Sequence, residues 1–196
     1  RQHQNNIIAA TNQGLLSAPV NHPNLIHFAT WERDSAPPTS NQTFSGVAVA
    51  QGVLYAVEKT GDNAPDVLWA KTTNGWEQVW NQYYSISNIH SNGTQLAITS
   101  REGLGVLSNP YGIPITYDSY GGQDSFRPNF AILDGNGQLV VADASHGLCL
   151  QRNGEWIRTS PNGPWNNQTY HVAFAGDDVL VPVGIRDYTG KVWNRT

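Results

Sequence analysis

Short apolar runs, each preceded by a polar turn, recur along the chain at a nearly constant interval. In four of them a leucine follows a turn that contains glycine or aspartate, and these leucines are Leu54, Leu96, Leu139 and Leu180. The successive intervals are 42, 43 and 41 residues. This regular spacing predicts a structural unit that is repeated in tandem.

Two near-copies of one tetrapeptide support this period. Asn41-Gln42-Thr43-Phe44 and Asn167-Gln168-Thr169-Tyr170 lie 126 residues apart, which is three periods of 42. Each is followed by an alternating apolar stretch, a short polar turn and a second apolar run. Two further copies of the unit are therefore expected between them.

Asparagine–glycine turns between apolar runs predict how each unit folds. Asn74-Gly75 precedes Trp76, and Asn153-Gly154 lies just before Trp156. Such turns favour β-hairpins because both residues accept a positive φ. No stretch shows a 3.6-residue apolar period over a helical length. The pattern therefore predicts four short antiparallel strands per unit.

Four strands in a unit of about 40–45 residues are typical of the blades of a β-propeller, in which neighbouring sheets bury each other's faces around an axis. We expect an all-β fold, with Trp76 and Trp156 as wedges between blades. The chain is expected to form one domain over residues 1–196, with about four to five four-stranded blades, as part of a larger propeller. The predicted blades are 5–33, which begins at its second strand, 44–80, 84–118, 126–158, and 170–196, which stops after two strands and a fragment.

Composition and charge narrow the choice of partner. Charged residues make up 13% of the chain, and only 11 residues are basic, with a net charge of −4. A nucleic-acid partner needs a dense cationic surface, so none is expected. No apolar run approaches the ~20 residues that cross a bilayer, so we expect no membrane span. A chain that starts at Arg1 and contains no methionine is expected to be a processed product or an excised piece.

Catalytic motifs are not found in the sequence. Asp143, Ser145 and His146 have the residue types of a hydrolytic triad, but triads are built from separate elements rather than from one tight loop. The segment 134–137 lacks the later glutamate of a calcium loop and is better explained as a hairpin turn. Cys149, the single cysteine, lies between apolar residues and is expected to be buried and inert. We therefore expect no enzymatic activity, no metal and no cofactor.

A family resemblance rests on the second half of the chain. The segment Val141-Ala142-Asp143-Ala144-Ser145-His146-Gly147-Leu148 resembles the blade motif of the two-component-regulator propellers of Bacteroidetes. The longer stretch 126–148, with 181–187 downstream, is similar to the PorZ-like surface proteins of the type IX secretion system. The resemblance implies an exported protein at the cell surface, outer membrane or periplasm, peripheral to the membrane. It also implies partners in the secretion and attachment complex and contact with anionic lipopolysaccharide.

The binding face of a propeller carries the loops between second and third strands and the links between blades. The candidates expected on this face are arginines, whose guanidinium groups bind carboxylate or phosphate, and residues with aromatic rings, which stack on sugars. These candidates are Arg101, Tyr120, Arg127, His146, Trp165, Arg186 and Tyr188. The structural alternative is that they are loop solubilisers and ion pairs at blade edges.

The favoured function is therefore a PorZ-like binding or adaptor propeller in the complex that attaches secreted cargo at the cell surface. The alternative is the periplasmic, glycan-sensing ectodomain of a two-component regulator. A glycan lyase or hydrolase is less favoured, because the sequence offers no converging acids or metal ligands.

Overall fold

The computed structural model describes residues 2–3, 5–34, 37, 43–122, 125–159, 171–175 and 178–180. Within these residues nearly all regular structure is β-strand, and the one helical element is a single 3-10 turn, η1 (Phe28–Thr30). Strand pairing is antiparallel throughout this part of the chain. The predicted all-β class is confirmed.

Four of the sheets contain four strands each, joined in chain order. The first holds β1 (Gln2–His3), β2 (Asn6–Thr11), β3 (Gly14–Pro19) and β4 (Glu32–Arg33). The second holds β5 (Phe44–Ala50), β6 (Val53–Glu58), β7 (Val67–Thr72) and β8 (Gly75–Trp80). The third holds β9 (Ile86–Ser91), β10 (Leu96–Ser100), β11 (Leu104–Leu107) and β12 (Ile115–Tyr117). The fourth holds β13 (Pro128–Leu133), β14 (Leu139–Asp143), β15 (Gly147–Arg152) and β16 (Glu155–Thr159). A further pair consists of β17 (Ala173–Ala175) and β18 (Asp178–Leu180).

In the second, third and fourth sheets the second strand is buried on both faces, which is why each of these strands begins with an apolar run. In β6, Leu54 and Ala56 pack in the cluster shared with the first sheet, whereas Tyr55 and Val57 pack in the cluster shared with the third. β10 and β14 alternate in the same way. Because successive side chains point to opposite faces of a strand, each second strand joins two neighbouring sheets.

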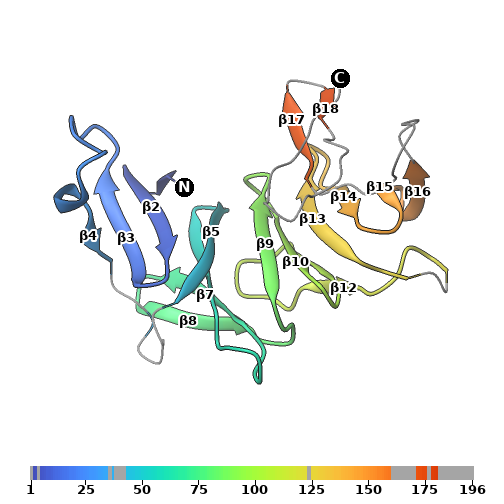
Figure 1. Ribbon diagram of the computed structural model, residues 1–196, viewed down its shortest axis with the longest axis horizontal. Helices are drawn as coiled ribbons and strands as arrows, with labels where there is room; N and C mark the ends of the chain where they lie inside the picture. Colours follow the sequence, from blue (N-terminus) through green and yellow to red (C-terminus); the bar gives the residue numbers. More distant parts are fainter. Residues whose placement is uncertain are drawn as a thin grey trace, which may run out of the picture.

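Apolar clusters fill the interfaces between consecutive sheets, so the core lies between the sheets. Trp76 is part of the cluster between the first and second sheets, and Trp156 packs against the one between the third and fourth. Figure 1 shows the sheets following one another along an arc, from β2 and β3 in blue to β17 and β18 in orange-red. This is the arrangement of propeller blades, with both tryptophans in the predicted position.

The four leucines that revealed the repeat occupy equivalent places, since each lies on the second strand of its sheet. The first three of them are fully buried. The N-terminal sheet differs from the expectation that it begins at its second strand, because Gln2 and His3 of β1 pair with β2. Two polar residues carry no apolar alternation, so the sequence pattern could not reveal this short strand.

The turns after the second strands share one face of the fold with the links that enter the first strands, because antiparallel strands reverse direction at every turn. At this face β6, β10 and β14 end in the buried polar residues Glu58, Ser100 and Asp143. Each of them pairs with the first residue of its neighbouring first strand, beside a shift in register. The same strand position therefore supplies a polar side chain that can organise the loops of this face.

Candidate ligand-binding face

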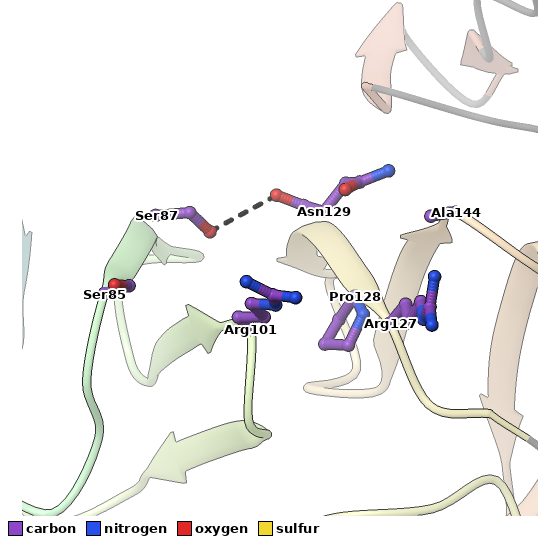
Figure 2. A pocket seen from close by; sticks show the side chains of 7 residues that line it. All are labelled: Ser85, Ser87, Arg101, Arg127, Pro128, Asn129 and Ala144. Atoms are coloured by element: carbon purple, nitrogen blue, oxygen red, sulfur yellow. Dashed lines mark hydrogen bonds between the residues drawn. The ribbon is translucent and has the colours of Figure 1, made fainter.

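A hollow of about 290 Å³ lies on this face, where the third and fourth sheets meet. It is lined by the starts of two first strands with the links before them, and by two turns that follow second strands. The lining residues are Ser85, Ser87, Arg101, Arg127, Pro128, Asn129 and Ala144 (Figure 2). The Ser87 hydroxyl donates a hydrogen bond to the carbonyl oxygen of Asn129 at 3.3 Å, which joins the two sheets at the hollow.

Arg101 and Arg127 bring two positive charges to this hollow. Figure 2 shows them on either side of Pro128. Both residues are exposed, and neither guanidinium makes a hydrogen bond or ion pair with a residue in the described part of the chain. The described lining contains no carboxylate. Two such guanidinium groups at one site favour a ligand that carries a carboxylate or phosphate.

Asp143 positions the segment that carries Arg127. Its carboxylate is fully buried, and Oδ2 accepts hydrogen bonds from the backbone N–H of Arg127 at 2.8 Å and the Tyr120 hydroxyl at 2.9 Å. Oδ1 accepts from the backbone N–H groups of Ser145 at 2.7 Å and His146 at 2.9 Å. One carboxylate therefore holds the β14–β15 turn and the link before β13 together.

Ser100 organises the turn that carries Arg101 in a similar way. Its buried hydroxyl oxygen accepts hydrogen bonds from the N–H groups of Glu102 and Gly103, both at 3.1 Å. The same hydroxyl donates to the Gly103 carbonyl at 3.2 Å. The Arg101 backbone is thus fixed at the rim, while its long side chain extends over the hollow.

A second hollow of about 500 Å³ adjoins the first, because both are lined by Ser85 and Arg101. Its other lining residues are Asp62, Tyr84 and Glu102. The backbone N–H of Tyr84 donates to the Glu102 carboxylate at 3.0 Å. The second hollow therefore combines two acidic side chains with one basic side chain.

Two of the predicted site residues contact the buried carboxylate of Asp143. Tyr120 is 6% exposed, packs in the core cluster of the third and fourth sheets and is bound to Asp143. His146 is half-buried, and its Nδ1 lies 3.1 Å from Oδ1 of Asp143. Tyr120 is therefore buried where a surface position was expected, whereas His146 keeps a partly exposed position in the β14–β15 turn. Ligand binding by either residue stays a prediction.

The remaining predicted residues divide into two groups. Arg101 and Arg127, which are 26 positions apart in sequence, are brought to one hollow. Trp165, Arg186 and Tyr188 lie outside the described residues, and their predicted role stays a prediction.

Sequence reasoning missed Ser85, Ser87, Pro128 and Asn129 as lining residues. Small polar residues and proline are common in links, so their identity carried no signal. Their position immediately before or at the start of a first strand could have identified them, because those strand starts converge on the loop face.

Cys149 is buried with no exposed surface, as the sequence predicted. Burial is the main cause that raises the pKa of its thiol to about 12. Burial likewise raises the pKa of the neighbouring Tyr120 far above its ordinary value, with a further contribution from the Asp143 charge. Both groups stay protonated at neutral pH, so neither supplies an anionic nucleophile.

Two kinds of feature are not seen in the described ranges. No three His, Cys, Asp or Glu side chains gather there in a group that could hold a metal ion. No helix there is long and apolar enough to cross a bilayer.

No family model matches the chain. No curated protein matches its sequence. Solved structures do resemble it. PorZ, a surface component of the type IX secretion system of Porphyromonas gingivalis, superposes with a TM-score of 0.67 at 17% identity, over 93% of this chain and 25% of PorZ. The extracellular domain of a one-component system of B. thetaiotaomicron gives a TM-score of 0.66 at 14% identity, over 98% of this chain and 26% of that one.

A gluconolactonase of Xanthomonas campestris is also similar, with a TM-score of 0.61 at 8% identity, over 90% of this chain and 65% of the enzyme. This likeness corrects the prediction that the chain is not an enzyme. That prediction rested on the absence of known catalytic motifs. The gluconolactonase is an enzyme with a similar fold, although its sequence shares few residues with this chain. Whether this chain catalyses a reaction is therefore a question for an activity assay.

The chain spans about a quarter of the PorZ and one-component-system chains and 65% of the gluconolactonase. At these identities the likenesses concern the fold, and they agree with the sheet order and the packing between sheets described above. The chain has a β-propeller fold.

Proposed function

We propose that this propeller is the ligand-binding part of an exported bacterial protein, and that its loop face binds an anionic glycan between the third and fourth sheets. The observation that carries the proposal is the pair Arg101 and Arg127. Both residues line one hollow, and neither guanidinium forms an ion pair with a described residue. Arginine binds carboxylate and phosphate through two parallel hydrogen bonds, which suits an acidic saccharide.

The other lining groups favour a sugar over a simple inorganic anion. Ser85 and Ser87 are exposed hydroxyl-bearing residues, and the Asn129 side chain adds an amide. Hydroxyl and amide groups exchange hydrogen bonds with sugar hydroxyls. The size of the hollow, about 290 Å³, is at the lower end of ordinary ligand pockets and suits one or two sugar rings.

The biological setting that we favour is the PorZ-like one. The ligand would then be anionic lipopolysaccharide, and the partners would be other proteins of the secretion and attachment complex. Support comes from the sequence resemblance and from the shared fold of a protein described as a surface component of that system.

A second setting is favoured by the similarly strong likeness to a bacterial extracellular domain of a one-component system. In this setting the same face would bind a glycan fragment as a signal. The two settings share the chemistry of the site and differ in what the propeller is attached to.

Substitution of the two arginines tests the proposal. Arg101→Ala and Arg127→Ala should each weaken binding of an acidic oligosaccharide by about tenfold, the loss expected for one charge-assisted contact. Arg152→Ala is the matched control, because it removes the same charge from an exposed position at the far end of β15. Binding is measured by isothermal titration calorimetry, after a glycan array has selected the acidic oligosaccharide.

If both variants bind the selected oligosaccharide as tightly as the parent chain, the proposal is wrong. If no acidic saccharide on the array binds the parent, the proposal is wrong as well. Mass spectrometry of the saccharide after incubation shows whether binding leads to turnover.

A further inference from the structure

The two adjoining hollows, which share Ser85 and Arg101, form one trough whose lining changes from basic to acidic along its length. Arg127 lines only the first hollow, whereas Arg101 lines both. Asp62 and Glu102 line only the second hollow. Positive charge therefore lies towards the fourth sheet and negative charge towards the second. A ligand that spans both hollows meets Arg127 at one end, Arg101 in the middle, and the carboxylates of Asp62 and Glu102 at the other end.

The charged side chains of the trough are not joined in ion pairs with one another. No ion pair joins Arg101 or Arg127 to Asp62 or Glu102, all of which belong to the described residues. Glu102 uses one carboxylate oxygen to accept the hydrogen bond from the Tyr84 N–H, which holds it at the rim. The other oxygen accepts no hydrogen bond from the described residues.

The loop that supplies Asp62 is longer than the corresponding turns of the other described sheets. β6 and β7 are separated by residues 59–66, whereas β10 and β11 are separated by 101–103 and β14 and β15 by 144–146. Contacts at its base hold the longer loop in place: the Thr60 hydroxyl donates to the Ala64 and Pro65 carbonyls, both at 2.8 Å. The longer loop thus adds the carboxylate of Asp62 to that of Glu102, which comes from the short turn between β10 and β11.

Tyr84 adds an aromatic surface at the acidic end. It is 40% exposed and lines the second hollow together with Asp62 and Glu102. An exposed ring beside carboxylates suits a sugar that carries an ammonium group, because the ring contacts the apolar face of the sugar and attracts its positive charge.

We propose that the ligand of this face is a zwitterionic saccharide, in which a carboxylate or phosphate on one unit lies close to a free amine on a neighbouring hexosamine. The anionic group binds Arg101 and Arg127, and the ammonium group binds Asp62 and Glu102. This inference rests on the proposed function, because it takes the anionic end of the ligand to lie at the two arginines.

A matched pair of probes tests it. Tetrasaccharides of alternating glucuronic acid and glucosamine are prepared with the amines either free or N-acetylated, and their binding is measured at low ionic strength, where exposed charges are least screened. The parent chain should bind the free-amine form about tenfold more tightly than the acetylated form, the size of one charge-assisted hydrogen bond.

Asp62→Asn with Glu102→Gln should abolish this preference. The affinity for the acetylated form should be unchanged or higher than that of the parent, because the double variant removes negative charge near the acid and keeps both arginines. Both substitutions keep the side-chain shape, and glutamine keeps an oxygen that can accept from the Tyr84 N–H. The double variant thus removes charge without removing the contact that holds position 102.

The outcomes separate the two proposals. If the parent binds both probes equally, and Arg101→Ala weakens both, the zwitterionic inference is wrong and the anionic site stands. A preference for the free-amine form that persists in the double variant also overturns the inference. If Arg101→Ala and Arg127→Ala leave both affinities unchanged, the anionic site itself is wrong.

Discussion

The buried carboxylate of Asp143 accepts a hydrogen bond from the backbone N–H of Arg127 at 2.8 Å, across 16 positions of sequence. In return, the carbonyl oxygen of Arg127 accepts from the N–H of Ala144 at 2.9 Å. The link that precedes β13 is therefore fixed to the end of β14 on both sides of a single residue. Arg127 has a rigid backbone and an exposed side chain, which is the arrangement that lowers the entropic cost of binding.

Asp143→Asn should destabilise the fold by about 2–4 kcal/mol. Both carboxylate oxygens of Asp143 accept hydrogen bonds from the surrounding donors. An asparagine has only one side-chain oxygen, and its NH₂ group cannot accept hydrogen bonds from the donors that face the second position. The free energy of unfolding is measured by urea denaturation.

Asp134→Asn is the matched control for that measurement. Asp134 also closes a turn between two strands, but the hydrogen bonds from the N–H groups of Asn136 and Gln138 both reach its Oδ1 alone. An asparagine keeps that acceptor, so this change should cost less than about 1 kcal/mol. Equal losses in the two variants would contradict the structural role assigned to Asp143.

Trp76→Ala should destabilise the chain by about 3–5 kcal/mol, the usual cost of deleting a large core aromatic side chain. Trp76 is 9% exposed and packs in the cluster that joins the first and second sheets. Phe28→Ala is the control, since Phe28 is 73% exposed and its removal should change stability by less than about 0.5 kcal/mol. Thermal and urea unfolding report the difference, and a small loss in Trp76→Ala would show that the sheets do not depend on this wedge.

Stability should fall as the pH rises from about 10 to about 12. Burial raises the pKa of Tyr55 and of Tyr83 from the ordinary 10.0 to about 12 in the folded chain. Above the ordinary pKa the unfolded chain loses these protons first, which favours unfolding. The stability that these two tyrosines contribute is fully present below pH 10, and it is lost as the pH rises through their pKa of about 12 in the folded chain.

Tyrosinate absorbance measured during a pH titration checks this expectation. The folded chain should show at least two tyrosines that ionise only near pH 12, while the urea-unfolded chain shows a single transition near 10. If all tyrosines of the folded chain titrate near pH 10, the burial of these two side chains is contradicted.

The Cys149 thiol should resist alkylation in the folded chain at pH 8 and react at once in denaturant. The thiol is fully buried, so the reagent cannot reach it. Burial also raises its pKa to about 12, so very little of the reactive thiolate forms at pH 8. Mass spectrometry after timed exposure to iodoacetamide gives the rate. Fast labelling of the folded chain would show that the interface between the third and fourth sheets opens readily.

The repeat of four-stranded units could be predicted from sequence because the second strand of each unit has the same burial requirement. Second strands buried on both faces must be continuously apolar, and the leucine spacing at Leu54, Leu96 and Leu139 records that need directly. The short strand β1 could not be predicted, because two polar residues show no alternation.

The candidate binding face was predictable only in part. Antiparallel topology places the turns after second strands on the same face as the links, so Arg101 and Arg127 could be proposed as site residues. Tyr120 could not be distinguished from them by sequence. Its ring fills space between two sheets and its hydroxyl is bound by Asp143, and both facts depend on partners that lie far along the chain.

The sequence by itself determined the unit, its strand order and the type of packing, because alternation and turn chemistry act over a few residues. Only the tertiary structure decided which side chains meet. Asp62, Arg101 and Arg127 belong to three consecutive units, and they lie along one trough because neighbouring sheets are stacked face to face with their loops on one side. Contacts of this kind depend on the angle and offset between whole sheets, which no local pattern encodes.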